Sequence, residues 1–206
     1  LVAVDNTFLG PVFQSPFELG ADLVLYSATK FLGGHSDIIA CAALSRVADL
    51  MNSVRDYRTI LGGTIASDTA WLLTRSIETL WVRMERQAQK ATKVAEVLNG
   101  HPKIEKLLFP GLLSEADGQA YEVFRKQCHR PGSMITLLLK NTDRAGAYRF
   151  LDHLQIFHLA VSLGRDRITG GASAKHDPQR HVGGRPGPLR YLRLDGLVVG
   201  RIGKFR

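Results

Sequence analysis

Cysteine is scarce in this chain, since only Cys41 and Cys128 occur among its 206 residues. Two thiols cannot form a disulfide framework, and they are too few for a cysteine-rich metal site. We therefore expect both side chains to be buried or inert, in a protein of the reducing cytoplasm. No apolar run approaches the roughly 18 residues of a membrane-spanning helix, and no signal peptide precedes the first strand-like segment, so we expect no membrane partner.

Acidic residues are sparse only near the C-terminus, and this explains the net charge of +8. Residues 165–206 contain ten Lys or Arg against three Asp, whereas residues 1–164 contain seventeen against sixteen acidic residues. No basic helix with interleaved aromatic residues occurs elsewhere, so we do not expect nucleic acid as a partner. One alternative from outside the enzymes stays open, a non-catalytic basic fragment that binds polyanions through residues 165–206.

The first 66 residues have the pattern of an α/β domain. Three segments are short, apolar and rich in β-branched residues, as is typical of strands buried on both faces: LVAVD, ADLVLYSA and DIIACAAL. Between the first two, GPVFQSPFELG has room for a short crossover helix. This alternation predicts a mostly parallel sheet.

Three further parts follow in the chain. Apolar residues at helical spacing predict one long helix over residues 67–100 that links two domains. Alternating strands and helices then predict a smaller α+β domain over residues 101–164, from KIEKLLF, GQAYEVFRKQC, SMITLLLK, DRAGAYRFLDHLQI and FHLAVSLG. Residues 165–206 hold eight Gly and three Pro with little periodicity, and only LRYLRLDGLVVG there suggests a strand pair.

Polar side chains follow two predicted strands at their carboxyl ends, where open α/β sheets bind ligands. Asp5 ends the first strand, and Ser27, Thr29 and Lys30 follow the second. A ligand matched to all of them needs a cationic ring nitrogen, an anionic group and an electrophilic carbon, and pyridoxal phosphate has these three features. Taken singly, an aspartate at a strand end is usually a turn residue, and a lysine in a glycine-rich loop is usually solvated. A P-loop is excluded because Lys30 precedes the glycines.

One long segment resembles the hallmark of the Cys/Met-metabolism pyridoxal-phosphate enzymes, which include cystathionine γ-synthase, cystathionine γ-lyase and methionine γ-lyase: VDNTFLGPVFQSPFELGADLVLYSATKFLGGHSD. The similarity continues through WLLTRSIETLWVRMERQ and HPKIEKL to YRFLDHLQIFHLAVSLG, over about residues 1–164. GPVFQSP, LYSATK and LQIFHLAVSLG look most similar to methionine γ-lyase-like members. The resemblance implies fold type I of the pyridoxal-phosphate-dependent transferases. Residues 1–66 would be a remnant of the large domain, and residues 101–164 the C-terminal small domain.

The resemblance also implies roles for residues of the motif. It makes Lys30 the lysine that forms the Schiff base with pyridoxal 5'-phosphate, and Asp5 the partner of the pyridine nitrogen. Ser27 and Thr29 become phosphate ligands, and Thr7 a support for Asp5 and the ring.

Three residues lie outside this set. Ser162, in VSLG, would lie near the α-carboxylate of an amino-acid substrate if the resemblance holds there. His35 and Asp37 form an H-x-D pair. Hydrogen bonds that fix the loop are the favoured interpretation of this pair and metal binding is the alternative, so we predict no metal site.

The chemistry implied by the resemblance is that of a lyase or transferase in cysteine and methionine metabolism. A methionine γ-lyase-like enzyme would eliminate the γ-substituent of a sulfur amino acid, with Lys30 removing the α-proton. γ-Replacement, as in O-acylhomoserine sulfhydrylase or in the transsulfuration enzyme cystathionine γ-synthase, remains the alternative. Members of the family are homotetramers built from dimers that share active sites.

The chain departs from the family in two ways. Relatives are about twice as long, and this chain begins inside a strand without an initiator Met, so we expect an incomplete and inactive copy. After AVSLG the family continues with a sequence like GIESLAEHPQSMTHSDM, where this chain has RDRITGGASAKHDPQRHV. Permitted codons for residues 165–182 encode the family-like sequence once a single base is deleted. We therefore predict a frameshift, with a genuine basic extension as the alternative.

Overall fold

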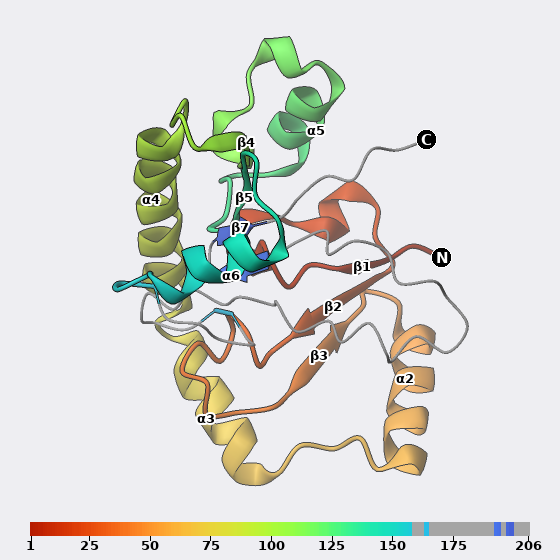
Figure 1. Ribbon diagram of the computed structural model, residues 1–206. Coiled ribbons are helices and arrows are strands. Elements are labelled where there is room, and N and C mark those ends of the chain that lie inside the picture. The colour runs from red at the N-terminus through yellow and green to blue at the C-terminus, as the bar shows by residue number, and fades with distance from the viewer. Residues whose placement is uncertain (158–162, 165–191, 195–196, 200–206) are drawn as a thin grey trace, which may run out of the picture. The chain divides into compact units, whose positions relative to one another are not determined.

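The computed structural model describes residues 1–157, 163–164, 192–194 and 197–199 (Figure 1). These residues form two compact units, and the division falls inside a helix. The first unit contains Leu1–Arg86, Ser114–Gly132 and Gly164, and the second contains Gln87–Leu113, residues 133–157, Leu163 and the residues described beyond 190. The grouping of Ser114–Gly132 with the first unit is not indicated by the sequence pattern, which runs residues 101–164 together as one domain.

The first unit is built around a three-stranded sheet in the order β1 (Ala3–Asp5), β2 (Leu23–Ser27) and β3 (Cys41–Leu44). β1 and β2 run parallel, and between them lie α1 (Gly10–Phe13) and the 3-10 helix η1 (Pro16–Leu19). The strands predicted in LVAVD and ADLVLYSA and the short crossover helix are confirmed, whereas only the second half of DIIACAAL forms a strand. A mostly parallel sheet is not confirmed, because β3 pairs antiparallel to β2. The segment between these two strands forms turns instead of the crossover helix that a parallel pairing requires.

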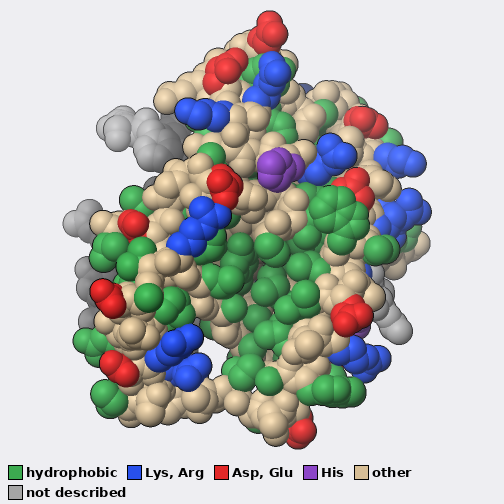
Figure 2. Space-filling view, turned by 180° about the vertical axis from the view of Figure 1, so that it is seen from behind, with side chains coloured by type: hydrophobic (Ala, Val, Ile, Leu, Met, Phe, Trp, Pro, Cys, Tyr) green, Lys and Arg blue, Asp and Glu red, His purple; other side chains and the backbone are tan. Residues whose placement is uncertain are grey.

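Only one face of this sheet is fully covered. In β2, Val24 and Tyr26 are buried, whereas Leu25 between them is 38% exposed, and Leu44 of β3 is 43% exposed. Side chains alternate between the faces of a strand, so the buried pair marks the core side. The prediction of strands buried on both faces is therefore wrong for β2. Figure 2 shows hydrophobic side chains gathered in one continuous area of the surface.

The helices of the first unit differ from the prediction in two places. α2 (Ala48–Leu61) has no buried residue, and the sequence pattern gives no sign of it. The single helix expected over residues 67–100 is two helices, α3 (Ser67–Ile77) and α4 (Leu80–Leu98). They separate because the carbonyl of Ser76 bonds outside the helical pattern: Thr79 Oγ1 donates to it at 3.2 Å, and a guanidinium nitrogen of Arg83 donates at 2.9 Å.

Ser114–Gly132 contains the 3-10 helix η3 (Glu115–Asp117) and α5 (Gln119–Gln127), the helix predicted for this stretch. His129 N donates to Phe13 O at 2.7 Å and so ties the segment to α1. Cys128 is half-buried, and this burial raises the pKa of its thiol. Cys41 is exposed on the edge strand β3, so of the expectation that both cysteines are buried or inert, burial is wrong for Cys41 and inertness stays a prediction.

The second unit has a four-stranded sheet in the order β4-β5-β7-β6. β4 (Ile104–Leu108) runs antiparallel to β5 (Ile135–Leu139), which is parallel to β7 (Leu197–Val199), and β7 pairs antiparallel with β6 (Leu192–Leu194). The predicted strands over KIEKLLF and SMITLLLK and the strand pair in LRYLRLDGLVVG are thus confirmed. Most of FHLAVSLG and residues 165–191 lie outside the described residues.

Helices and the sheet of the second unit enclose an apolar core. The 3-10 helix η2 (Pro110–Leu112) follows β4, and α6 (Arg144–Asp152) follows β5. Asp143 caps α6, because its Oδ1 accepts from Gly146 N at 2.7 Å. The buried residues of this core come from α4, the β4–η2 segment, β5 and α6: Ala91, Ala95, Phe109, Ile135, Leu137 and Leu151. No helix among the described residues is long and apolar enough to cross a membrane.

Candidate functional site

Two parallel strand ends provide the base of the candidate site. Asp5 pairs opposite Leu25 in the register of β1 and β2, so the chain leaves both strands at the same edge of the sheet (Figure 1). Asn6 N donates to Leu25 O at 2.9 Å and extends the pairing by one residue. The last residues of the two strands, Asp5 and Ser27, therefore lie at one edge, which is the arrangement that the sequence predicts.

Thr7 connects the two strand ends through its hydroxyl group. The Thr7 Oγ1 donates to Asp5 Oδ1 at 2.6 Å and accepts from Ser27 N at 2.8 Å, and Thr7 N donates to the same carboxylate oxygen at 3.0 Å. Thr7 is only 7% exposed, so water competes weakly for these bonds. In the described part of the chain no group is bonded to Asp5 Oδ2 or to Ser27 Oγ. Asp5 is exposed and Ser27 is half-buried.

Lys30 lies in the turn that follows β2 and is partly buried. Its N–H donates to Ser27 O at 3.0 Å, and its carbonyl accepts from Gly34 N at 2.8 Å. Thr29 Oγ1 donates to Ala40 O at 3.2 Å and accepts from Ala40 N at 3.0 Å. This exchange with Ala40 gives Thr29 a role in closing the loop, while its contact with a phosphate stays a prediction.

Gly164 packs against the backbone of Lys30. Its φ is +90°, and a Cβ at this position would lie 2.6 Å from the carbonyl carbon of Lys30 and 2.7 Å from the nitrogen of Phe31. Only glycine tolerates both this conformation and this approach. The glycine of VSLG thus lies at the lysine turn. Ser162, two positions earlier, is outside the described residues, and its contact with a substrate carboxylate stays a prediction.

The H-x-D pair lies just after the lysine turn, and both side chains are exposed. His35 Nδ1 is 2.7 Å from Gly33 O and 3.5 Å from Ser76 Oγ. A carbonyl can only accept, so Nδ1 donates to it, and this bond supports the loop-fixing interpretation for His35. No group of three His, Cys, Asp or Glu suited to a metal ion occurs among the described residues.

Sequence reasoning missed two residues that shape the site. Asn6 is 3% exposed, and its Nδ2 donates to Gly10 O at 2.9 Å and to Gln14 O at 3.3 Å, which fixes the turn into α1. Its position between Asp5 and Thr7 puts it on the opposite face of the chain, a signal that side-chain alternation supplies. The other residue is Arg83, in α4, for which the sequence offers no local signal.

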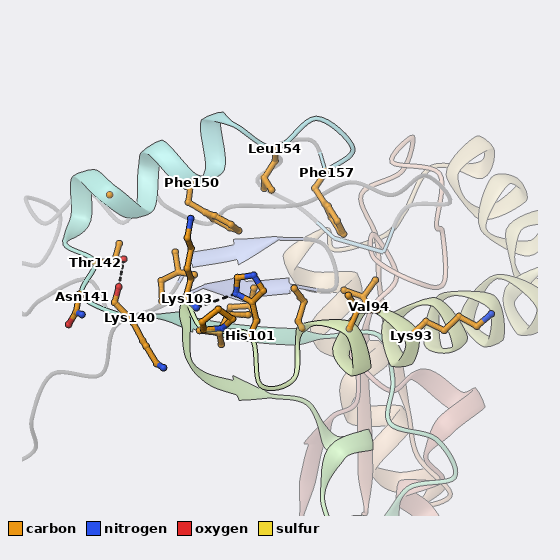
Figure 3. A pocket seen from close by; sticks show the side chains of 17 residues that line it. Lys93, Val94, His101, Lys103, Lys140, Asn141, Thr142, Phe150, Leu154 and Phe157 are labelled. Carbon is orange, nitrogen blue, oxygen red and sulfur yellow. Dashed lines mark hydrogen bonds between the residues drawn. The ribbon is translucent and has the colours of Figure 1, made fainter.

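A separate cavity of about 900 Å³ lies within the second unit (Figure 3). Phe150, Leu154 and Phe157 point into it from α6 and the segment that follows, and Val94 lines it from α4 (Figure 3). Lys103 extends toward α6, and its backbone N–H donates to His101 Nδ1 at 3.2 Å (Figure 3). None of the predicted site residues that the structure describes lines this cavity. Its described lining is mostly apolar and includes lysines but no Asp or Glu.

The sequence of the chain is similar to that of known enzymes. The family described as "Cys/Met metabolism PLP-dependent enzyme" matches residues 1–169, PLP being pyridoxal phosphate. An L-methionine gamma-lyase of Fusobacterium nucleatum subsp. nucleatum is 38% identical over 192 residues, covering 89% of this chain and 47% of the relative. A cystathionine gamma-lyase of Bacillus subtilis (strain 168) is 39% identical over 164 residues, covering 80% of this chain and 42% of the relative.

Solved structures agree with these sequence matches. An apo methionine gamma lyase from Micromonospora echinospora matches with a TM-score of 0.81 at 34% identity, over 94% of this chain and 51% of that one. A cystathionine gamma synthase from Xanthomonas oryzae pv. oryzae matches with a TM-score of 0.81 at 33% identity, over 95% of this chain and 50% of that one. The chain spans about half the length of the relatives it matches, and its structure matches about half of the chain of fold type I PLP enzymes. The chain belongs to the Cys/Met metabolism PLP-dependent enzyme family, a family of lyases and synthases.

Proposed function

We propose that Asp5, Ser27 and Lys30 hold pyridoxal phosphate, and that the chain is the lysine-bearing part of a C–S lyase of sulfur amino-acid metabolism. The Thr7 bridge is the observation that carries this proposal. It fixes a carboxylate at one strand end and the backbone of the next strand end, with Lys30 three residues further on. The bond from Thr7 N to Asp5 Oδ1 is that of an ordinary Asx turn, so the support comes from the further link of Thr7 Oγ1 to Ser27 N on the neighbouring strand.

The open atoms at this edge fit the chemical features of the cofactor. Asp5 Oδ1 is occupied by Thr7, which leaves Oδ2 to accept from a protonated ring nitrogen. Ser27 Oγ is a donor suited to a phosphate. Lys30 supplies the amine for an aldehyde. The three ligand features therefore meet three groups on one short stretch of two neighbouring strands.

Each residue then has a defined task. With pyridoxal phosphate bound, Asp5 would hold a proton on the ring nitrogen, and Thr7 would hold the carboxylate in place. The Lys30 amine would hold the aldehyde group of the cofactor, and its Nζ would accept the α-proton of an amino-acid substrate. When bound, pyridoxal phosphate supplies the electron sink for the charge left on the α-carbon. Proton transfer by a positioned amine typically contributes about 10²–10⁴-fold to a rate.

Elimination at the γ-carbon is the reaction we propose for the whole enzyme of which this chain corresponds to a part, while the chain alone is expected to be inactive. The support is the similarity to proteins described as methionine gamma-lyase and cystathionine gamma-lyase, at 38% and 39% identity. γ-Replacement is the second candidate, favoured by the fold match to a cystathionine gamma synthase. We also propose that the substrate is an amino acid whose carboxylate lies near Ser162. The protein is further proposed to be a cytoplasmic homotetramer.

Residues 165–206 are proposed to result from a frameshift. The family match ends at residue 169, only five residues beyond Gly164, which supports a change of reading frame near this point. The pairing of β7 with β5 favours the alternative of a genuine extension. Resequencing the gene around codons 164–165 decides between them, because a frameshift requires one extra base before family-like codons.

Titration of the chain with pyridoxal phosphate tests the cofactor site. We expect a saturable absorbance band in the unaltered chain and in Lys90→Ala, an exposed lysine of α4, and loss of the band in Lys30→Ala. Equal bands in all three proteins would refute the proposal. Salt-sensitive retention on an anionic matrix, lost on truncation after Gly164, would instead favour polyanion binding through the tail.

A further inference from the structure

Arg83 joins the lysine turn to the junction between α3 and α4. Its Nη1 donates to Phe31 O at 2.8 Å, and its Nη2 donates to Leu32 O at 3.2 Å. From the same guanidinium, Nη2 also donates to Ser76 O at 2.9 Å and Nε donates to Thr79 Oγ1 at 3.1 Å. Four acceptors from two distant segments thus share one planar group.

The two acceptors in the turn directly follow Lys30. The carbonyls of Phe31 and Leu32 come from a turn whose own bonds are short and local, with Gly33 N on Ala28 O and Gly34 N on Lys30 O, both at 2.8 Å. Phe31 and Leu32 are 3% and 7% exposed, so water cannot readily replace the guanidinium. Hydrogen bonds from a charged donor to shielded carbonyls are stronger than neutral ones, and a fixed fork orients its acceptors.

Gly34 makes room for this guanidinium. Its φ is +70°, and a Cβ there would overlap Nη1 and the central carbon of Arg83. Gly34, the second glycine of FLGG, is therefore required both by its positive φ and by its close packing against Arg83. Gly62, at the end of α2, has nearly the same φ of +72° and nothing within 4 Å of a Cβ. Substitutions at Gly34 and Gly62 can therefore be compared directly, because the backbone conformations match and only Gly34 has a neighbouring side chain.

We propose that Arg83 is a positioning residue that locks the turn after Lys30, and so fixes the direction in which the Lys30 amine leaves the backbone. The proposal rests on the proposed cofactor role of Lys30. The lock itself can be measured without cofactor. A failure of the positioning role of Arg83 can therefore be distinguished from a failure of the cofactor role of Lys30.

Amide hydrogen exchange of the full chain, measured without cofactor, tests the lock directly. In Arg83→Met we expect the amides of Gly33 and Gly34 to exchange about tenfold faster or more, because local opening no longer breaks charged hydrogen bonds. The amides of β2 should keep their rates. Arg86→Met, at an exposed position on the same helix, should change neither set. Equal exchange of the turn in both variants would overturn the proposal.

A second experiment decides the matter if Arg83→Met loses its fold. Gly34→Ala should lower the denaturant midpoint more than Gly62→Ala, since both carry the same backbone strain and only Gly34 faces Arg83. In the Arg83→Lys background, with a slimmer side chain, this excess should shrink, as expected for contacting residues. Equal shifts for Gly34→Ala and Gly62→Ala would contradict the proposal.

Labelling extends the test to the lysine. With pyridoxal phosphate and borohydride, the share of label on Lys30 relative to other lysines should fall several-fold in Arg83→Met and Arg83→Lys, and stay unchanged in Arg86→Met. A change in exchange of the turn without a change in labelling would overturn the claim that the lock directs Lys30. Absence of label on Lys30 in the unaltered chain would refute the cofactor proposal and leave the exchange result standing.

Discussion

The two units of the chain use their residues in opposite ways. The first keeps polar groups at strand ends and holds them by bonds to backbone atoms, as in the bridge from Asp5 through Thr7 to Ser27. The second gathers apolar side chains around β5 and encloses a cavity with mostly apolar walls. The hydrogen-bonded strand ends and the apolar core thus lie in different units, and substitutions in either unit test whether ligand binding and stability depend on different residues.

Removing an apolar core residue should have the largest effect on stability. Leu151 of α6 is 2% exposed in the core of the second unit. We expect Leu151→Ala to lower the free energy of unfolding by about 2–5 kcal/mol, from lost burial and the cavity left behind. Val97→Ala, at a position 79% exposed, should cost below about 0.5 kcal/mol. Urea unfolding measures both, and similar losses would show that this core does not carry the stability.

Removing the Thr7 hydroxyl should lower stability less than Leu151→Ala does, and it should weaken the binding of pyridoxal phosphate. Thr7→Val leaves Ser27 N without a partner and leaves Asp5 Oδ1 with only the backbone N–H of residue 7, which costs about 1–3 kcal/mol. Because the carboxylate is then held by one hydrogen bond instead of two and is no longer linked to Ser27, affinity for pyridoxal phosphate should fall about tenfold, the equivalent of ~1.4 kcal/mol. Thr7→Ser keeps the hydroxyl and should stay near the unaltered chain. Equal affinities of Thr7→Val and Thr7→Ser for pyridoxal phosphate would show that the Thr7 hydroxyl does not support the site.

Gly164→Ala should disturb the turn around Lys30, although the two residues lie far apart in the sequence. A methyl group there would press on the Lys30 backbone, so the cost should exceed the ~1 kcal/mol that a positive φ alone imposes on alanine. Gly100→Ala provides the control, with a φ of +78° and no atom within 4 Å of a Cβ. A smaller loss of stability for Gly164→Ala than for Gly100→Ala would contradict the close packing.

Thiol reactivity should give the smallest effect. Burial raises the pKa of Cys128, so at any pH near 8 a smaller fraction of it is thiolate than in the unfolded chain. Cys41, which is exposed, should react faster with iodoacetamide. The folded state binds the Cys128 proton more tightly, so its contribution to stability is complete at neutral pH and is lost as the pH rises through the raised pKa. Faster alkylation of Cys128 would show that it is not shielded.

The sequence predicts the strand ends well because short apolar segments and the polar residues after them are local signals. It predicts Asp5, Thr7, Ser27 and Lys30 as a group, and the structure brings the first three together by hydrogen bonds. It does not predict α2, whose residues bury no apolar face, or the break between α3 and α4. That break depends on Arg83, whose partners at Phe31 and Leu32 lie about fifty positions away. Such long-range bonds leave no periodic trace in a sequence.

The site on Lys30 is the central claim, and one measurement tests it most directly. The purified chain is incubated with pyridoxal phosphate, reduced with borohydride, digested and mapped by mass spectrometry. The account predicts that the label lies predominantly on Lys30, because its turn is fixed beside Asp5 and Ser27. Label scattered over exposed lysines such as Lys90 and Lys93, with no excess on Lys30, would contradict it.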